Sequence, residues 1–291
     1  MPGNDDTGWS RWPAPAKLNL FLHVVGRRAD GYHELQTVFR LLDFADEVAI
    51  RVRADGRIER PVGLAGLAPE QDLVVRAARA LRHASGTPLG ADIRVDKRIP
   101  AGGGLGGGSS DAATVLRALD HLWGLRLGVD RLAAIGLPLG ADVPVFVRGR
   151  SAWAEGIGDR LVPLDLPPQT YVVLDSAEAV PTGPVFAAPE LTRNTPRTTI
   201  RSFLEGSATR NDLEPVVRRR HPAVDAALAW LGRFSTARLT GSGGCVFAPV
   251  ADRAAGERIA AACPSPWRAF IAEACDRSPL LDRLPAAGAG C

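Results

Sequence analysis

Six of the seven residues 102–108 are glycines, within the segment DKRIPAGGGLGGGSSDAATVLRAL that spans residues 96–119. Ordering a glycine costs roughly 0.5–1 kcal/mol more than ordering an alanine, so the run needs a physical reason. A strand pattern precedes it and a helix pattern follows it, which argues against a flexible linker. The N–H groups of a bare loop and of a helix start can bind an anion together. We therefore expect a phosphate-binding loop, with Ser109 and Ser110 capping the helix and offering hydroxyl groups to phosphate oxygens.

Two common nucleotide-binding loops do not fit this segment. The Walker A motif needs a lysine inside the loop, and the sequence has none there. The dinucleotide pattern GxGxxG is matched by Gly102, Gly104 and Gly107, but a run this rich in glycine matches it almost automatically. The preceding strand alternates Ile93 and Val95 with charged residues, whereas the first strand of a dinucleotide-binding fold is buried on both faces. The loop therefore belongs to neither class.

Helical and strand patterns mix along the whole chain of 291 residues, which is long enough for one large domain or two ordinary ones. Antiparallel-type alternation beside helices predicts an α+β fold. The Pro-rich segment LDLPPQ marks the expected boundary between an N-terminal domain, 1–165, which carries the glycine loop, and a C-terminal domain, 166–291. Residues 141–164 predict two short strands around a turn. Helices are predicted up to Gly86 and at 109–123, 129–136, 183–188, 211–219, 223–233 and 251–262, and strands at 14–25, 35–56, 91–100, 170–176, 237–240, 245–250 and 267–274.

Composition limits the partners and the location of the chain. A net charge of +3 suits an anionic ligand but is too mild to indicate nucleic acid. The four cysteines lie far apart without metal-ligand spacing, which favours a reducing compartment. With no signal-peptide pattern and no run of 18 apolar residues, we expect a cytoplasmic protein without a membrane partner. Only Lys17 and Lys97 among the 35 basic residues are lysines, which favours sites that need a compact ammonium group.

Several motifs resemble those of the superfamily of galactokinase, homoserine kinase, mevalonate kinase and phosphomevalonate kinase. PAGGGLGGGSSDAA resembles the second motif of that superfamily and LTGSGGCVF the third. PAKLNLFLHVVGRRADGYHELQTVF resembles the first motif of one of its families, the 4-diphosphocytidyl-2-C-methyl-D-erythritol kinases, which PELTRNTP and NDLEP also match. The matches run from about residue 13 to residue 275, and DGYHELQTVF is the specific discriminator.

The resemblance implies a two-domain small-molecule kinase with its active site in the cleft between the domains. Such an enzyme transfers a phosphoryl group from ATP to the 2-hydroxyl of a cytidine diphosphate sugar alcohol, in non-mevalonate isoprenoid precursor biosynthesis. Asp142 matches the catalytic aspartate, which accepts the hydroxyl proton, and Lys17 matches the lysine beside it. Magnesium is expected because triphosphate charge needs neutralising, although its ligands and the oligomeric state stay unassigned.

Two further sets of residues follow from the resemblance. The ATP-binding set is Lys97, Pro100, Gly102, Gly103, Gly104, Leu105, Gly106, Gly107, Gly108, Ser109 and Ser110. The substrate-binding set is Asn19, Tyr32, His33, Thr182 and Phe186, in which Tyr32 and Phe186 would sandwich cytosine and His33 would read its polar edge. The chain departs from the family at Asp72, which stands where asparagine is frequent near the adenine. It also departs at Gly183, where proline often follows the threonine.

Two alternative functions remain open at this point. A sister kinase that acts on homoserine or mevalonate would share the glycine loop but should lack the DGYHELQTVF segment. A non-catalytic nucleotide- or RNA-binding module would need a basic surface. The only dense basic cluster is VVRRRHP, residues 216–222, and it lacks the interleaved aromatics that RNA binding favours.

Overall fold

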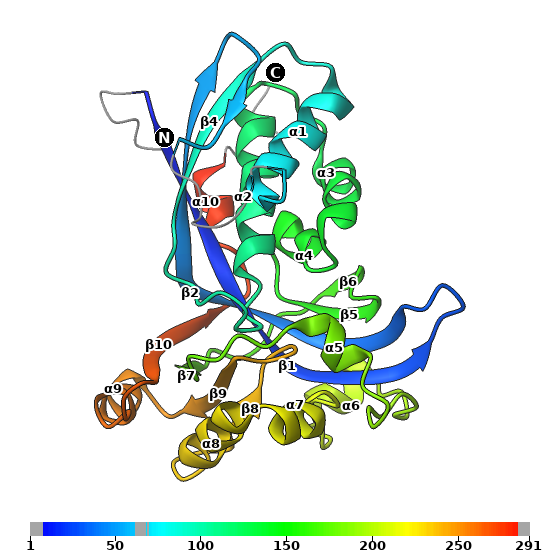
Figure 1. Cartoon of the computed structure of the whole chain (residues 1–291), viewed down its shortest axis with the longest axis vertical. Coiled ribbons are helices and arrows are strands. Elements are labelled where there is room, and N and C mark those ends of the chain that lie inside the picture. The colour runs from blue at the N-terminus through cyan, green and yellow to red at the C-terminus, as the bar shows by residue number, and fades with distance from the viewer. Residues whose placement is uncertain (1–7, 62–67, 69, 285–291) are drawn as a thin grey trace.

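A long hairpin of two strands forms the centre of the molecule. The computed structural model describes residues 8–61, 68 and 70–284. Strand β1 (Ser10–Arg27) pairs antiparallel with β2 (His33–Arg53) from end to end, with a turn at Gly31 whose φ of +88° favours glycine. In Figure 1 this hairpin crosses the molecule from the upper helices to the lower right edge. It therefore contributes side chains to both halves of the fold.

Ten strands form one mixed sheet within the described residues, in the order β3-β4-β2-β10-β7-β9-β8, with β1 and β5 also paired to β2 and β6 paired to β5. All pairs are antiparallel except β3 with β4. The remaining strands are β3 (Ile58–Glu59), β4 (Gly90–Asp96), β5 (Ala152–Gly156), β6 (Arg160–Pro163), β7 (Thr170–Asp175), β8 (Arg238–Leu239), β9 (Cys245–Val250) and β10 (Arg268–Cys275). The expected α+β class is confirmed.

The helices form two groups, each with its own core (Figure 1). The upper group packs on β1, β2 and β4 around side chains such as Trp12, Leu81 and Leu116. The lower group packs on β7 and β9 around side chains such as Val217 and Leu228. The helices are α1 (Leu73–Ser85), α2 (Gly107–Leu122), α3 (Val129–Gly136), the 3₁₀ turn η1 (Leu137–Leu139), α4 (Val143–Arg148), α5 (Thr182–Phe186), α6 (Ile200–Leu204), α7 (Glu214–Arg220), α8 (Pro222–Leu231), α9 (Arg253–Ala261) and α10 (Leu280–Arg283).

The two cores are joined through the sheet rather than by a loose linker. Strand β2 pairs with β10 at Leu41 and Leu42, so hydrogen bonding continues from one half to the other. The buried side chain of Arg40 forms an ion pair with Asp276 and donates to the carbonyl groups of residues 166 and 167. These bonds hold the segment in which the sequence places the boundary. The division at residues 165 and 166 stays a prediction.

The segment 141–164 differs from its sequence prediction. Two short strands do meet around a turn, as β5 and β6, but the segment also contains helix α4 (Val143–Arg148), which the prediction lacked. An unbroken apolar run has the same pattern in a buried helix and in a buried strand, so periodicity does not separate the two. The deciding signals are local: Pro144 lies in the first turn, and Gly149 ends the helix with a left-handed φ of +64°.

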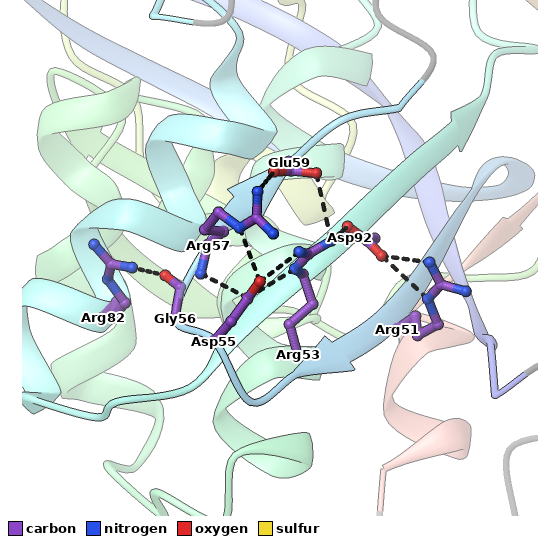
Figure 2. A network of polar contacts seen from close by, with 8 residues as sticks. All are labelled: Arg51, Arg53, Asp55, Gly56, Arg57, Glu59, Arg82 and Asp92. Atoms are coloured by element: carbon purple, nitrogen blue, oxygen red, sulfur yellow. Dashed lines mark hydrogen bonds and ion pairs between the residues drawn. The ribbon is translucent and has the colours of Figure 1, made fainter.

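An arginine-rich network fixes the turn between β2 and β3 (Figure 2). Asp92 on β4 is only 1% exposed and accepts from Arg51 at 2.7 Å and from Arg53 at 2.8 Å. Asp55 in the turn pairs with Arg53 at 2.6 Å and with Arg57 at 2.8 Å. Burial raises the pKa of Asp92, but the hydrogen bonds from the two β2 arginines outweigh it and hold the pKa below its ordinary value.

Replacing Asp92 with asparagine should lower the free energy of unfolding by about 1–3 kcal/mol at pH 7, because a buried charged partner of two arginines is lost. A carboxylate with a lowered pKa stabilises the fold above its unfolded pKa of about 3.9, so the deficit should shrink as the pH falls below about 4. Urea unfolding at pH 7 and at acid pH measures both effects. The control is Asp55→Asn, whose side chain is 41% exposed and whose loss should lower the free energy of unfolding less than Asp92→Asn does.

Candidate active site

A single large cavity of about 1120 Å³ brings the predicted residues together. Its walls come from the glycine loop, the β1–β2 hairpin, the starts of α1 and α5, and the segment before α4. The predicted residues that line it are Lys17, Asn19, Tyr32, His33, Lys97, Pro100, Gly102, Gly103, Gly104, Leu105, Gly106, Gly107, Gly108, Ser109, Asp142, Thr182 and Phe186. Ser110 is the one member of the predicted set outside this lining.

The glycine loop packs backbone to backbone against the segment that precedes β9. The N–H of Cys245 donates to the carbonyl of Gly103 at 3.1 Å, and the hydroxyl of Thr240 donates to the carbonyl of Gly104 at 3.3 Å. A Cβ on Gly103 would meet the Cys245 sulfur, and one on Gly104 would meet the carbonyl oxygen of Thr240, each at less than 3.0 Å. These glycines are therefore needed for the close approach of two loops as well as for an open anion site.

Helix α2 begins two residues earlier than the sequence suggests, so the predicted serine caps are wrong. Its N-cap is Gly106, in a left-handed conformation with φ of +73°, and no side chain among the described residues caps the helix. Ser109 lies in the first turn and lines the cavity, whereas Ser110 is buried and its Oγ has no hydrogen-bond partner among the described residues. Gly106 closes the loop in this left-handed conformation, which glycine adopts without strain. The uncapped first N–H groups of α2 remain available to an anion.

Lys17 and Asp142 meet beside the glycine loop. The ammonium of the buried Lys17 lies 3.4 Å from Oδ2 of Asp142 and donates to the carbonyl of Gly104 at 2.9 Å. Asp142 occupies the N-cap position of α4, yet its side chain makes no capping hydrogen bond and is 32% exposed. Its carboxylate is therefore free to act on a ligand in the cavity. The pair combines a proton acceptor with a fixed positive charge.

Asn19 supports this pair from the same strand. Its side-chain oxygen accepts from Lys17 at 2.5 Å, and its amide donates to the hydroxyl of Thr37 at 2.9 Å. Its backbone N–H donates to Thr240, in the segment that holds the glycine loop. Asn19 also lines the cavity. Its predicted contact with the substrate stays a prediction. The structure adds a second role, which is to orient the lysine ammonium.

Lys97 lies under the start of α2 between two carboxylates. Its ammonium pairs with Asp46 on β2 and with Asp111 on α2, the latter at 2.8 Å. Asp46 also accepts from the N–H of Ile99 at 2.8 Å, which fixes the turn into the glycine loop. Burial alone would lower the pKa of Lys97, but Asp111 and Asp46 outweigh it and raise the pKa. The sequence indicated the lysine but not its two partners.

Asp111 is the member of this cluster that should titrate near neutrality. Burial, together with the charge of Asp46, raises its pKa to about 7 against the opposing effect of Lys97. The folded state therefore binds a proton that the unfolded state loses between about pH 4 and pH 7, so stability should fall as the pH rises through that range. In Asp111→Asn the contribution of this carboxyl group to the pH dependence should vanish. The free energy of unfolding of the variant, relative to that of the wild type, should therefore rise by about 1–3 kcal/mol between pH 5 and pH 8.

Urea unfolding of the wild type and Asp111→Asn between pH 5 and pH 8 measures this difference. The matched control is Asp130→Asn on α3, whose carboxylate is exposed and pairs with Arg148. Parallel stability curves for the wild type and Asp111→Asn would show that Asp111 does not carry the extra proton.

The other end of the cavity is lined by aromatic rings. The His33 and Phe186 rings lie 5.2 Å apart at an interplanar angle of 35°. Tyr32 also lines this end, but its side chain is largely exposed, and among the described residues the ring in contact with Phe186 is His33. Thr182 starts α5, and its hydroxyl lies 2.7 Å from that of Ser242. The sandwich of Tyr32 and Phe186 around a base stays a prediction.

Comparisons with known proteins agree with this geometry. The family described as "GHMP kinases N terminal domain" matches residues 72–150, and "GHMP kinases C terminal" matches residues 187–269. A relative from Xanthomonas campestris pv. campestris (strain B100) is 59% identical over 279 residues, which are 96% of this chain and 95% of the relative. It carries the name 4-diphosphocytidyl-2-C-methyl-D-erythritol kinase. This chain belongs to the 4-diphosphocytidyl-2-C-methyl-D-erythritol kinase family of GHMP kinases. The resemblance of its motifs is thereby confirmed.

A second relative and two solved structures are also similar to this family member. A relative of the same name from Halorhodospira halophila is 57% identical over 277 residues, which are 94% of this chain and 96% of the relative. A solved 4-(cytidine 5'-diphospho)-2C-methyl-D-erythritol kinase aligns with a TM-score of 0.79 at 36% identity, over 91% of this chain and 98% of that one. A mevalonate kinase aligns at 0.64 with 15% identity, over 91% of this chain and 98% of that one, which shows a shared fold alone. GHMP kinases are ATP-dependent phosphotransferases, so ATP is the expected phosphoryl donor of this family member.

The sequence placed Asp72 near the adenine, but the predicted site sets included neither Asp72 nor its partner Arg60. Asp72 caps α1 by accepting from the N–H of Val74 at 3.1 Å, and its other oxygen pairs with Arg60. Both side chains line the cavity beside the glycine loop. The signal was present, because an aspartate directly before an amphipathic helix is a common N-cap. Its partner, twelve residues earlier in a different segment, has no local signature.

The basic cluster at 216–222 runs from α7 into the first residue of α8, and two of its three arginines pair with carboxylates. Arg218 pairs with Glu214 and Asp225, and Arg220 pairs with Glu190 at 2.8 Å. No helix in the described part of the chain is both long and apolar enough to span a bilayer.

Proposed function

We propose that this chain transfers the γ-phosphoryl group of ATP to the 2-hydroxyl of 4-diphosphocytidyl-2-C-methyl-D-erythritol, a step of the non-mevalonate isoprenoid pathway. The observation that carries the proposal is the Lys17–Asp142 pair, held at 3.4 Å beside the glycine loop in a cavity that ends in aromatic rings. The names of the relatives support the same substrate. The alternatives of a homoserine or mevalonate kinase and of a binding module are not favoured.

Each part of the cavity has a role in the proposed reaction. Asp142 accepts the proton of the substrate hydroxyl as that oxygen attacks the γ-phosphorus, while the bond from phosphorus to the departing ADP oxygen breaks. Lys17 stabilises the ionised Asp142 and the negative charge on the phosphoryl oxygens. The N–H groups of residues 106–108 at the start of α2 hold the phosphates. Positioning and charge stabilisation supply most of the catalysis in phosphoryl transfer.

Magnesium belongs to the proposal as an ion carried by the nucleotide. The cavity places an uncapped helix start and the ammonium of Lys17 beside the glycine loop, a charge arrangement that fits a metal-bound triphosphate. The ion would neutralise the triphosphate, and we assign it no protein ligand. A cytoplasmic location and the absence of a nucleic-acid partner stay predictions from composition.

The test is ADP release by the purified protein with magnesium and ATP, when each candidate alcohol is offered alone. We expect turnover with 4-diphosphocytidyl-2-C-methyl-D-erythritol and none above background with homoserine or mevalonate. Turnover with one of the other alcohols would keep the kinase chemistry and reject the substrate. ATP binding without turnover of any alcohol would reject the kinase reaction itself.

A further inference from the structure

The aromatic end of the cavity contains a contact that the phosphoryl transfer does not require. Arg193, between α5 and α6, donates from Nε to Nε2 of His33 at 3.1 Å. Its guanidinium is anchored by three backbone carbonyls: Leu191 at 3.0 Å, Phe186 at 3.0 Å and Ala188 at 2.6 Å. These bonds fix the direction in which Nε–H points. The arginine therefore constrains the histidine more than the histidine constrains the arginine.

This contact determines where His33 carries its proton. A guanidinium has only N–H donors, so Nε2 of His33 must accept and cannot itself be protonated. Burial lowers the pKa of His33, and the positive charges of Arg193 and Arg27 lower it further, so the ring is neutral at pH 7. A neutral imidazole without a proton on Nε2 carries it on Nδ1. His33 is therefore a hydrogen-bond donor at Nδ1.

That donor is left for a ligand. His33 is the first residue of β2, and its ring lines the cavity beside Phe186. In the part of the chain that the structure describes, no protein group hydrogen-bonds Nδ1. A flat base that stacks against Phe186 would lie next to this N–H. The donors and acceptors on the edge of that base then decide whether it forms a hydrogen bond with the Nδ1–H of His33.

We propose that Arg193 is a positioning residue that holds His33 as an Nδ1–H donor, and that this donor selects cytosine over uracil. The inference rests on the proposed function, since it takes the base of the substrate to lie beside His33 and Phe186. The ring nitrogen N3 of cytosine is an acceptor, whereas the N3 of uracil carries a hydrogen. Two opposed donors would both stay unpaired in a partly buried site, which disfavours uracil.

Calorimetric titration with CDP and UDP tests the selection without requiring turnover. An excess of ADP is present throughout so that the phosphate-loop end of the cavity is already filled. We expect the wild type to bind CDP about 10–100-fold more tightly than UDP, the usual range for one correctly paired polar edge. In Arg193→Met, which removes every donor but keeps an unbranched apolar stem, the ratio should fall about 10-fold. Arg193→Lys restores a donor and should recover part of the ratio.

The matched control is Arg197→Met. Arg197 lies in the same segment as Arg193 and pairs at 2.6 Å with Glu34, the residue that follows His33. Among the described residues, Arg197 has no hydrogen bond to the His33 imidazole. Its loss should leave the CDP to UDP ratio unchanged. If Arg193→Met weakens both nucleotides equally, Arg193 only shapes the pocket and the proposal is wrong. A wild type without a preference for CDP overturns it as well.

Nitrogen-15 NMR of the imidazole rings tests the tautomer directly. The chain has five histidines, and the His33 signals are assigned by their absence in His33→Phe. We expect Nδ1 protonated in the wild type and a mixture of tautomers in Arg193→Met. A wild-type ring protonated at Nε2 contradicts the proposal. Neither readout depends on phosphoryl transfer, so a protein that selects CDP but fails the ADP-release test would disprove the kinase reaction and leave this inference intact.

Discussion

Asp142→Asn should lower kcat by about 10²–10⁴-fold, the range expected when a positioned general base is lost. The asparagine cannot accept the hydroxyl proton, and it removes the charge that Lys17 faces at 3.4 Å. The fold and the affinity for ATP should change little, because the Asp142 side chain is partly exposed and caps no helix. Steady-state ADP release gives kcat, and calorimetry with ADP gives nucleotide affinity.

The control for this variant is Asp165→Asn. Asp165 pairs with Arg150 on the surface, outside the cavity lining, and its loss should leave kcat within about twofold of the wild type. Near-normal turnover by Asp142→Asn would remove Asp142 from the catalytic role. A large loss of ADP affinity would instead mean that the carboxylate organises the phosphate site.

The features that the sequence predicted are those carried by local patterns. Strands with alternating apolar residues, the helix ended by Gly86 and the glycine loop before α2 all lie where their patterns place them. The motif resemblance brought Lys17 and Asp142 together across 125 residues of chain, which no periodicity could have done. The failure at Val143–Arg148 has a local cause, since a fully buried run has no periodicity to distinguish helix from strand.

The features that the sequence did not predict depend on contacts between distant segments. Asp46 and Asp111 lie 65 residues apart and become a cluster only when α2 packs against the hairpin. Arg193 and His33 lie 160 residues apart, and the motif PELTRNTP indicated family membership without indicating which atom its arginine would contact. Such partners are fixed by tertiary packing, and a single sequence records them only as ordinary charged residues.

Gly104→Ala should abolish measurable ATP binding and lower the free energy of unfolding by about 2–4 kcal/mol. The three atoms nearest to an added Cβ are all backbone atoms, first the carbonyl oxygen of Thr240, and backbone cannot move aside as a flexible side chain can. The φ of +74° at this position adds left-handed strain for any residue with a Cβ. The carbonyl of Gly104 also accepts from Lys17, so a displaced loop would move the Lys17 ammonium as well. Calorimetry with ADP and urea unfolding measure the two losses.

Gly86→Ala separates strain from collision. Gly86 ends α1 with a φ of +69°, and a Cβ there would meet no atom of the described residues within 4 Å. The variant should therefore lose only the cost of a left-handed residue, about 1 kcal/mol. The excess loss in Gly104→Ala then measures the collision between the glycine loop and the segment before β9. Equal losses in the two variants would show that the loop can move away from Thr240. In that case the glycine run would serve the phosphate alone, and the two halves of the active site would be less tightly joined than their backbone contacts imply.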